Sequence, residues 1–259
     1  MINPILGLLG LTPGYHELDV SLVFLVFFSI FFGILIGDAG YGLAYLVLTV
    51  LLSIWLKRKM MMDEEMRTAV LLFYLLGSSA IVWGLLTGTF FGQWGLPALV
   101  PQLNDAAFVT TLCFFLGALH LSIAHSWRAV LKYPSAKAIA DIGYICILWT
   151  AFFLARTLIL GDPFPSFGLW LVTSGIILVV LFTNPKRSNI LKGIGEGLGT
   201  IALSFMNNIT DVISYIRLFA VGMATVAVAN TTNYLAFGFG SGIIAVVGAA
   251  VILLSGHSL

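Results

Sequence analysis

The chain has 259 residues and a formal net charge of +1; 60% of its residues are hydrophobic and only 9% are charged. Soluble domains have roughly 25% charged residues, so this composition excludes an ordinary soluble protein and predicts an all-helical, polytopic membrane protein. The near-neutral charge gives no indication of nucleic-acid binding. Cys113 and Cys146 lie within apolar runs, and we interpret them as buried thiols rather than as metal ligands or a disulfide.

Eight apolar segments are predicted to cross a membrane, since about 20 apolar residues suffice for one helical span. They cover residues 20–36, 43–56, 68–91, 105–127, 139–160, 168–182, 200–229 and 241–259. Residues 1–19 form a lead-in that we place in the cytoplasm, and residues 20–259 form the transmembrane domain. The first apolar run, 20–56, is too long for one span, so a glycine-rich turn near Asp38 is predicted to fold it into a tight helical hairpin.

Basic residues are concentrated in alternate loops of this topology. With the N-terminus in the cytoplasm, the external loops contain only Arg156, whereas the cytoplasmic loops contain Lys57, Arg58, Lys59, Arg67, Arg128, Lys132, Lys137, Lys186, Arg187 and Lys192. This asymmetry follows the positive-inside rule. It predicts an integral membrane protein with a cytoplasmic N-terminus, which we place in a prokaryotic plasma membrane.

The seventh predicted span carries an arginine, Arg217, near its middle. An ionisable side chain at that depth costs about 2.5 kcal/mol or more on insertion scales. At roughly 100° per residue, the polar residues of this helix fall in one sector about 140° wide, with Arg217 at its edge. They are Thr200, Ser204, Asn207, Thr210, Asp211, Ser214 and Thr225. Two interpretations of Arg217 stay open: a charge on an ion path, or a structural salt bridge or hydrogen bond between helices.

A few other polar side chains lie in or beside the apolar runs. Asp38 is predicted to cap a turn at the membrane surface. Glu196 precedes the seventh span and either lines an entry for cations or caps that helix. His120 and His125 are either proton-relay groups or, as we favour, interfacial histidines bonded to backbone carbonyls. His257 has mainly apolar neighbours, which give no basis for assigning it a chemical role.

Five stretches of the sequence carry a family resemblance. Residues 13–19 are PGYHELD, 31–42 are FFGILIGDAGYG, 83–92 are WGLLTGTFFG, 214–220 are SYIRLFA, and 256–257 are Gly-His. In this order they resemble the membrane domain of subunit a, also called subunit I, of V-type and A-type rotary ATPases. The most specific elements are the Ser-Tyr-x-Arg-Leu signature with Tyr215 and Arg217, and the hairpin motif. The matching motif residues are Gly37, Asp38, Gly40, Tyr41, Gly42, Tyr215 and His257.

The resemblance implies a mechanism. In this family the last two spans are long and tilted against a rotating ring of proteolipids, each with one buried carboxylate. Arg217 matches the arginine that drives release of H⁺ or Na⁺ from that carboxylate. The half-channel would be lined by Ser204, Asn207, Thr210, Asp211, Ser214, Thr225 and Glu196. The implied partners are the proteolipid ring, the peripheral-stalk and central-stalk subunits, and membrane lipid; no nucleotide, cofactor or metal is implied, and the chain is not an enzyme on its own.

Two departures from the family pattern leave alternatives open. The family's large N-terminal cytoplasmic domain and the end of its last helix are expected to be absent from this chain. A non-conducting assembly or scaffold paralogue therefore remains a second interpretation. A third is an independent channel or transporter built around the Arg217 stripe.

Overall fold

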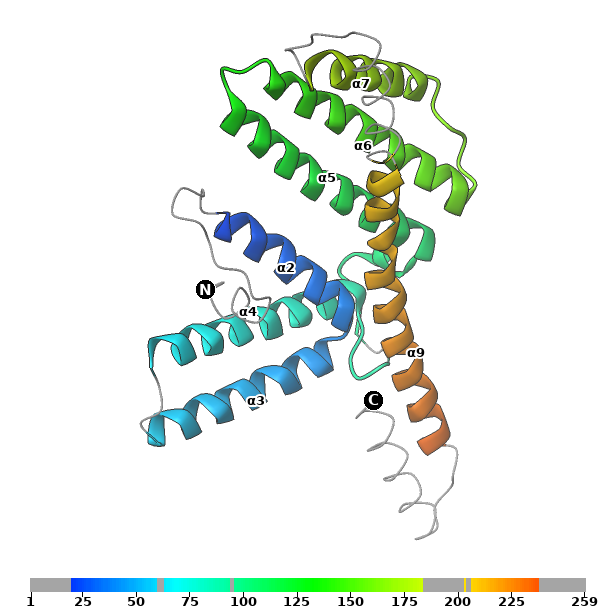
Figure 1. The fold of residues 1–259 in the computed structure, drawn as a ribbon. Coiled ribbons are helices and arrows are strands. Elements are labelled where there is room, and N and C mark those ends of the chain that lie inside the picture. The colour runs from blue at the N-terminus through cyan, green and yellow to red at the C-terminus, as the bar shows by residue number, and fades with distance from the viewer. Residues whose placement is uncertain (1–19, 60–62, 94–95, 184–202, 204–205, 238–259) are drawn as a thin grey trace. The chain divides into compact units, whose positions relative to one another are not determined.

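A computed structural model describes residues 20–59, 63–93, 96–183, 203 and 206–237 (Figure 1). Within these residues the regular structure is helical, apart from one isolated bridge between Phe90 and Gln93. The predicted all-helical class is therefore confirmed for the part of the chain that is described. The predicted lead-in 1–19 and the eighth span 241–259 lie outside it.

Within the described residues, the helices follow the order of the first seven predicted spans. They are α2 (Ser21–Ile36), α3 (Ala39–Arg58), α4 (Glu64–Thr87), the short 3₁₀ helix η1 (Pro101–Asn104), α5 (Ala106–Lys132), α6 (Lys137–Leu160), α7 (Gly168–Phe182) and α9 (Ile216–Phe237). By length and composition, α3, α4, α5, α6 and the run Met206–Ala236 are candidate membrane spans, whereas α2 and α7 have 16 and 15 residues. The structure thus supports five of the eight predicted spans.

The seventh predicted span is longer than expected. It was predicted to end at residue 229 in a polar turn, but α9 continues to Phe237. The hydroxyls of Thr231 and Thr232 donate to the carbonyls of Ala227 and Val228, four residues earlier. Side-chain bonds of this kind keep polar residues within a helix because the hydroxyl is satisfied by its own backbone.

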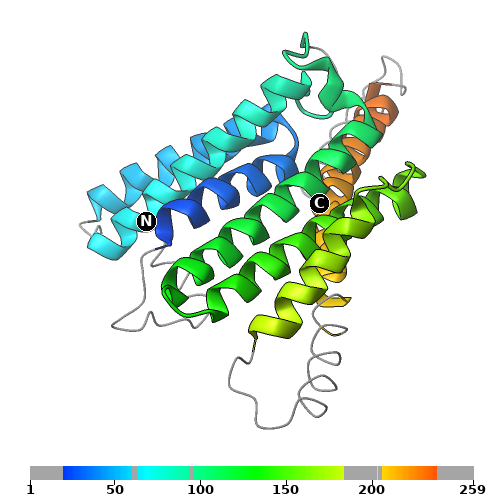
Figure 2. The ribbon, with the colours of Figure 1, turned by 90° about the horizontal axis from the view of Figure 1, so that it is seen from above.

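The chain divides into two compact units, and each is described by itself. The first consists of Met1–Asn104 with Leu218–Leu259, and the second of Asp105–Arg217. In the first unit, α2 and α3 both pack against α4 (Figure 1). In the second unit, α6 packs between α5 and α7 (Figure 2).

The α2–α3 turn of the first unit depends on residues without side chains. Gly37 ends α2 in the left-handed region, with φ 70°, which favours glycine because a Cβ is strained there. Gly84 lies so close to this turn that a Cβ on it would overlap the backbone nitrogen of Ala39. A Cβ on Gly42 would lie 2.7 Å from the nitrogen of Ile81. Small residues let α4 approach the turn closely, as is usual between membrane helices.

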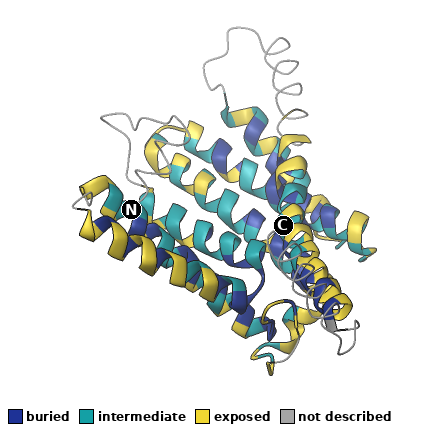
Figure 3. Ribbon diagram, turned by 90° about the horizontal axis from the view of Figure 1, so that it is seen from below, coloured by how far each residue is buried: buried dark blue, intermediate teal, exposed yellow. Residues whose placement is uncertain are grey.

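The second unit has an apolar core cluster to which α5, α6 and the segment before Arg217 contribute. Its buried residues are Phe114 and Ala118 of α5, Leu148, Phe152 and Ala155 of α6, and Val212 of the helical segment 206–214. Many residues of the helices in both units are exposed (Figure 3), and large apolar residues are among them, such as Leu48 of α3 and Trp170 of α7. A surface of this kind suits a lipid environment, since lipid tails solvate apolar side chains as well as a protein core does.

Candidate functional site

The segment before Arg217 is a helix with one irregular turn. Residues 206–214 are helical, and α9 begins at Ile216. Between them the N–H of Tyr215 donates to the carbonyl of Val212, three residues back, at 3.3 Å. Val212 is completely buried in the core of the second unit, and Ile213 and Ile216 pack against the same core. Val212, Ile213 and Ile216, which lie outside the predicted polar sector, thus form the packed side of this helix.

The polar stripe lies on the less buried side of this segment. Asn207, Thr210, Asp211 and Arg217 are exposed, and Ser214 is half-buried. The hydroxyls of Thr210 and Ser214 donate to the carbonyls of Met206 (2.9 Å) and Asp211 (2.7 Å). Thr225, also half-buried, donates to the carbonyl of Val221 at 3.0 Å. Each hydroxyl has used its proton on its own helix, so its oxygen remains able to accept a bond from water or from a partner.

Arg217 is exposed, and no carboxylate among the described residues lies within ion-pair distance of it. Of the other predicted site residues, Ser204, Glu196 and His257 lie outside the described part of the chain. The described portion of the predicted half-channel therefore consists of Asn207, Thr210, Asp211, Ser214, Arg217 and Thr225.

Tyr215 of the same motif contacts α5. Its hydroxyl lies 2.9 Å from Nδ1 of His120, with the two rings edge to face at 6.4 Å. Its ring covers Gly117, where a Cβ would lie only 2.5 Å from Cδ2 of Tyr215. At Nδ1, His120 therefore contacts a phenol rather than a backbone carbonyl, because the missing side chain at Gly117 lets the phenol come within reach of the imidazole.

Asp38 is completely buried and accepts four backbone hydrogen bonds. Its Oδ1 accepts from the N–H groups of Gly40 (2.7 Å) and Tyr41 (3.1 Å), which lie in the first turn of α3. Oδ1 also accepts from Phe91 (2.9 Å), and Oδ2 accepts from Gly92 (2.8 Å). The predicted cap is confirmed, but the carboxylate lies inside the first unit rather than at an open turn, because the loop after α4 folds over it.

The residues around Asp38 connect the stretch 31–42 with the stretch 83–92 and with α9. A Cβ on Gly40 would lie 2.6 Å from Cδ2 of Phe91, and the rings of Tyr41 and Phe91 meet edge to face at 5.6 Å. The Thr89 hydroxyl donates to the carbonyl of Gly37 at 2.7 Å. The buried amide of Asn233, on α9, donates to the carbonyl of Phe91 at 2.6 Å. The motif residues of the hairpin therefore form a polar junction within the first unit.

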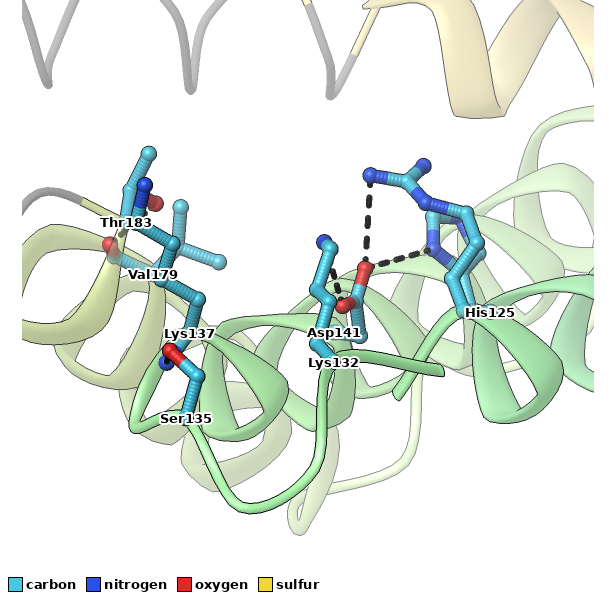
Figure 4. Close-up of polar contacts among 8 residues, drawn as sticks. His125, Lys132, Ser135, Lys137, Asp141, Val179 and Thr183 are labelled. Atoms are coloured by element: carbon cyan, nitrogen blue, oxygen red, sulfur yellow. Dashed lines mark hydrogen bonds and ion pairs between the residues drawn. The ribbon is translucent and has the colours of Figure 1, made fainter. Parts of the chain in front are cut away.

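A charged cluster that was not predicted lies where α5 meets α6 (Figure 4). Asp141 is completely buried, and its Oδ2 lies 2.6 Å from Nζ of Lys132. Its Oδ1 faces a guanidinium nitrogen of Arg128 at 3.4 Å and Nδ1 of His125 at 3.8 Å. His125 also stacks on Tyr144, with centroids 5.5 Å apart. The prediction that His125 bonds to a carbonyl is therefore wrong, because α6 places a carboxylate and an aromatic ring beside it.

The sequence carries a signal for this cluster. His125, Arg128 and Lys132 are spaced three and four residues apart, which places them on one face of a helix. Asp141 is an acidic residue in the first turns of the next apolar run. A carboxylate in that position needs a cation nearby, because burial of an unpaired charge is costly.

No group of three or more His, Cys, Asp or Glu side chains that could hold a metal ion occurs in the part of the chain that the structure describes. The buried thiol of Cys113 and the half-buried thiol of Cys146 are both free. Cys113 is thus buried as predicted, whereas Cys146 is only half-buried.

Comparison with known proteins identifies relatives along nearly the whole chain. No protein-family model matches it. The V-type ATP synthase subunit I of Borreliella burgdorferi is 34% identical over 280 residues, covering 99% of this chain and 45% of that protein. The V-type ATP synthase subunit I 1 of Treponema pallidum is 31% identical, covering 100% of this chain and 44% of that protein. The A-type ATP synthase subunit I of Methanocaldococcus jannaschii is 26% identical, covering 95% and 40%.

The chain spans less than half the length of these relatives. The similarity includes both V-type and A-type proteins, and it extends over the described helices as a whole rather than over one motif. The chain is therefore a homologue of V-type and A-type ATP synthase subunit I.

Proposed function

We propose that this chain is an ion-translocating membrane subunit of a V/A-type rotary ATPase, with Arg217 as its central charge. The observation that carries the proposal is the exposed position of Arg217 within the apolar run Met206–Ala236. An arginine in a membrane span normally faces a partner or water, because a guanidinium in contact with lipid is costly. The names of the homologues point to other rotary ATPase subunits as that partner.

The partner would be a proteolipid ring whose subunits each carry one membrane-buried carboxylate. In an apolar environment that carboxylate is neutral, with H⁺ or Na⁺ bound, because desolvation opposes its charge. Beside Arg217 the charged form is favoured: two unit charges 4 Å apart interact by about 4 kcal/mol at an effective dielectric of 20, which corresponds to roughly a thousandfold shift in ionisation. The ion would then leave. Arg217 itself does not give up its proton, so it also separates the two ion paths.

The polar stripe would carry the ion between Arg217 and one side of the membrane. Asn207, Thr210, Asp211 and Ser214 lie on the less buried side of the segment before Arg217, and the hydroxyl oxygens of Thr210 and Ser214 remain able to accept hydrogen bonds. Thr225 would serve the other side of the arginine. Ser204 and Glu196 are proposed to continue the path.

The wider assignment follows from the same proposal. Residues 1–19 would be a cytoplasmic lead-in, and 20–259 a transmembrane domain of eight spans in a prokaryotic plasma membrane. The central-stalk and peripheral-stalk subunits would be further partners. The pair formed by Arg156 and Asp162, with a shortest N–O distance of 2.6 Å, supports the orientation, because it neutralises the one basic residue of the proposed external loops.

The test is coupled ion transport by the assembled complex. We expect Arg217→Ala and Arg217→Lys to abolish ATP-driven ion uptake into membrane vesicles while the ring still copurifies. Lysine fails because its proton can be lost on desolvation. Arg67→Ala is the matched control, since Arg67 is an exposed arginine in the first turn of α4.

Two outcomes would contradict the proposal. Undiminished uptake with Arg217→Ala would leave a scaffold or assembly subunit as the better interpretation. Ion flux through liposomes that contain the purified chain alone would favour an independent channel or transporter.

A further inference from the structure

The end of α5 and the start of α6 together carry more positive charge than the ion pairs between them neutralise. Arg128, Lys132 and Lys137 contribute three positive charges, and Asp141 contributes one negative charge. With His125 neutral, these four residues have a formal charge of +2. The described ion pairs of these cations all go to Asp141.

The positive charges face the surroundings, whereas the negative charge does not. The side chain of Asp141 is 0% exposed, while those of Arg128 and Lys132 are 54% and 35% exposed. Lys137 is exposed and lies one helical turn before Asp141 on α6. An approaching anion therefore meets cations first, and the buried carboxylate holds Lys132 in place.

The cations also have hydrogen-bond donors to spare. Lys132 directs one of its three ammonium donors to Asp141. Arg128 approaches Asp141 at 3.4 Å, but Oδ1 of Asp141 has no hydrogen-bond partner among the described residues, so this contact uses none of the five guanidinium donors. A phosphate group suits such donors, since guanidinium and ammonium groups bind its oxygens.

Apolar side chains surround the cations. Val130, Leu131 and Tyr133 are 72%, 57% and 80% exposed. They lie at the end of α5, which is a candidate membrane span over Ala106–Lys132. If α5 crosses a bilayer, this end lies where headgroup phosphates and the first acyl carbons meet, and exposed aromatic residues are enriched at that depth.

We propose that the end of α5 and the start of α6 form a binding site for an anionic phospholipid. Arg128 and Lys132 bind the phosphate, Lys137 adds a nearby positive charge at the start of α6, and Val130, Leu131 and Tyr133 contact the glycerol and the upper acyl chains. A free phosphate ion would use the cations alone, so the neighbouring apolar surface favours a lipid. The site requires that α5 crosses the membrane, but it does not depend on ion movement at Arg217.

The test uses the purified full chain in detergent, titrated with phosphatidylglycerol or with phosphatidylcholine, with bound lipid counted by native mass spectrometry. We expect one saturable phosphatidylglycerol site. Each cation removed by Arg128→Gln or Lys137→Gln should weaken it by about fivefold, and the double variant by roughly 25-fold. Lys132 is left unchanged, because it neutralises Asp141.

Lys59→Gln is the matched control. Lys59 is also an exposed cation at the end of a candidate span, but it lies over the ring of Trp55 and has no part in the cluster. An equal loss in this control would mean that lipid responds to diffuse surface charge, and it would overturn the site.

Three further outcomes would also overturn it. One is equal binding of the two lipids by the unaltered chain. This outcome can be tested even if the variants fail to fold. Another is complete displacement of the lipid by soluble glycerol phosphate at a concentration equal to that of the lipid, which would indicate a simple anion site. The third is unaltered lipid binding together with loss of a copurifying ATPase subunit in the double variant, which would assign the surface to a protein partner.

Discussion

The hydroxyl of Tyr215 lies 2.9 Å from Nδ1 of His120, and this contact ties α5 to the irregular turn that precedes Arg217. Tyr215 is also held by packing, because its ring lies over Gly117. Arg217 follows two residues later and has no comparable contact of its own among the described residues. The contacts of the tyrosine therefore hold the backbone two residues before the arginine.

We expect Tyr215→Phe and His120→Ala each to lower the free energy of unfolding by about 1 kcal/mol, the usual net contribution of one hydrogen bond. The double variant should lose little more than either single variant, because both remove the same bond. Thermal unfolding in detergent measures this. Tyr234→Phe, at an exposed position on α9, is the control. Fully additive losses would show that the two side chains act separately.

Coupled transport gives a second measurement on the same variants. If Tyr215 positions Arg217, Tyr215→Phe should reduce ATP-driven ion uptake more than its loss of stability explains, and His120→Gln should restore part of what His120→Ala loses, since an amide can also bond to the phenol. If the uptake of each variant is proportional to its amount of folded protein, Tyr215 and His120 have only a structural role.

Asp38 should be the most sensitive carboxylate of the first unit. Asp38→Ala removes the acceptor for four backbone N–H groups that are buried or partly buried, and each unsatisfied group costs about 1–3 kcal/mol. We expect the loss to prevent accumulation of folded protein, measured as the monodisperse yield after extraction. The yield of Asp38→Asn should lie between that of the unaltered chain and that of Asp38→Ala. Asparagine keeps one acceptor oxygen, but its amide nitrogen would face the N–H of Gly92.

Asp63→Ala is the matched control for Asp38. Asp63 caps α4 by accepting one bond from the N–H of Met66 at 2.7 Å, and this bond is exposed. Loss of such a cap costs about 1 kcal/mol. Comparable effects of the two alanine variants would contradict a special role for the buried junction.

The Asp141 cluster predicts an asymmetry between its partners. Lys132→Met leaves a buried carboxylate without its nearest cation and should cost about 3 kcal/mol. Asp141→Asn leaves a partly exposed lysine that can reach water, and should cost about 1 kcal/mol. Denaturant or thermal unfolding compares the two variants directly. A larger loss for Asp141→Asn would show that the carboxylate contributes more than charge compensation.

The proposed orientation predicts which loops are reached from each side. In a background with Cys113→Ala and Cys146→Ala, a membrane-impermeant thiol reagent added to whole cells should label Gln102→Cys. It should reach Glu64→Cys and Ser135→Cys only after permeabilisation. All three positions are exposed. Labelling of Gln102→Cys and Glu64→Cys from the same side would contradict the topology, because α4 would then not cross the membrane.

Several features could be predicted from the sequence because they depend on near neighbours in the chain. Hydropathy identified the helical segments, since a span needs a continuous apolar run. The turn at Asp38 was predicted because glycines flank it, and Gly37 does take up a left-handed conformation there. Arg217 was notable simply as an ionisable residue within an apolar run.

The tertiary structure decided which distant groups meet. The Asp38 carboxylate accepts bonds from residues 53 and 54 positions away, and His120 meets Tyr215 across 95 positions. The bond from Asn233 to Phe91, across 142 positions, helps to keep α9 ordered where the sequence suggested a turn. Asp141 could not be paired with Lys132 before α5 and α6 were packed together. Hydropathy and turn signals report local conformation, whereas a buried polar group is stable only where folding brings its partner within bonding distance.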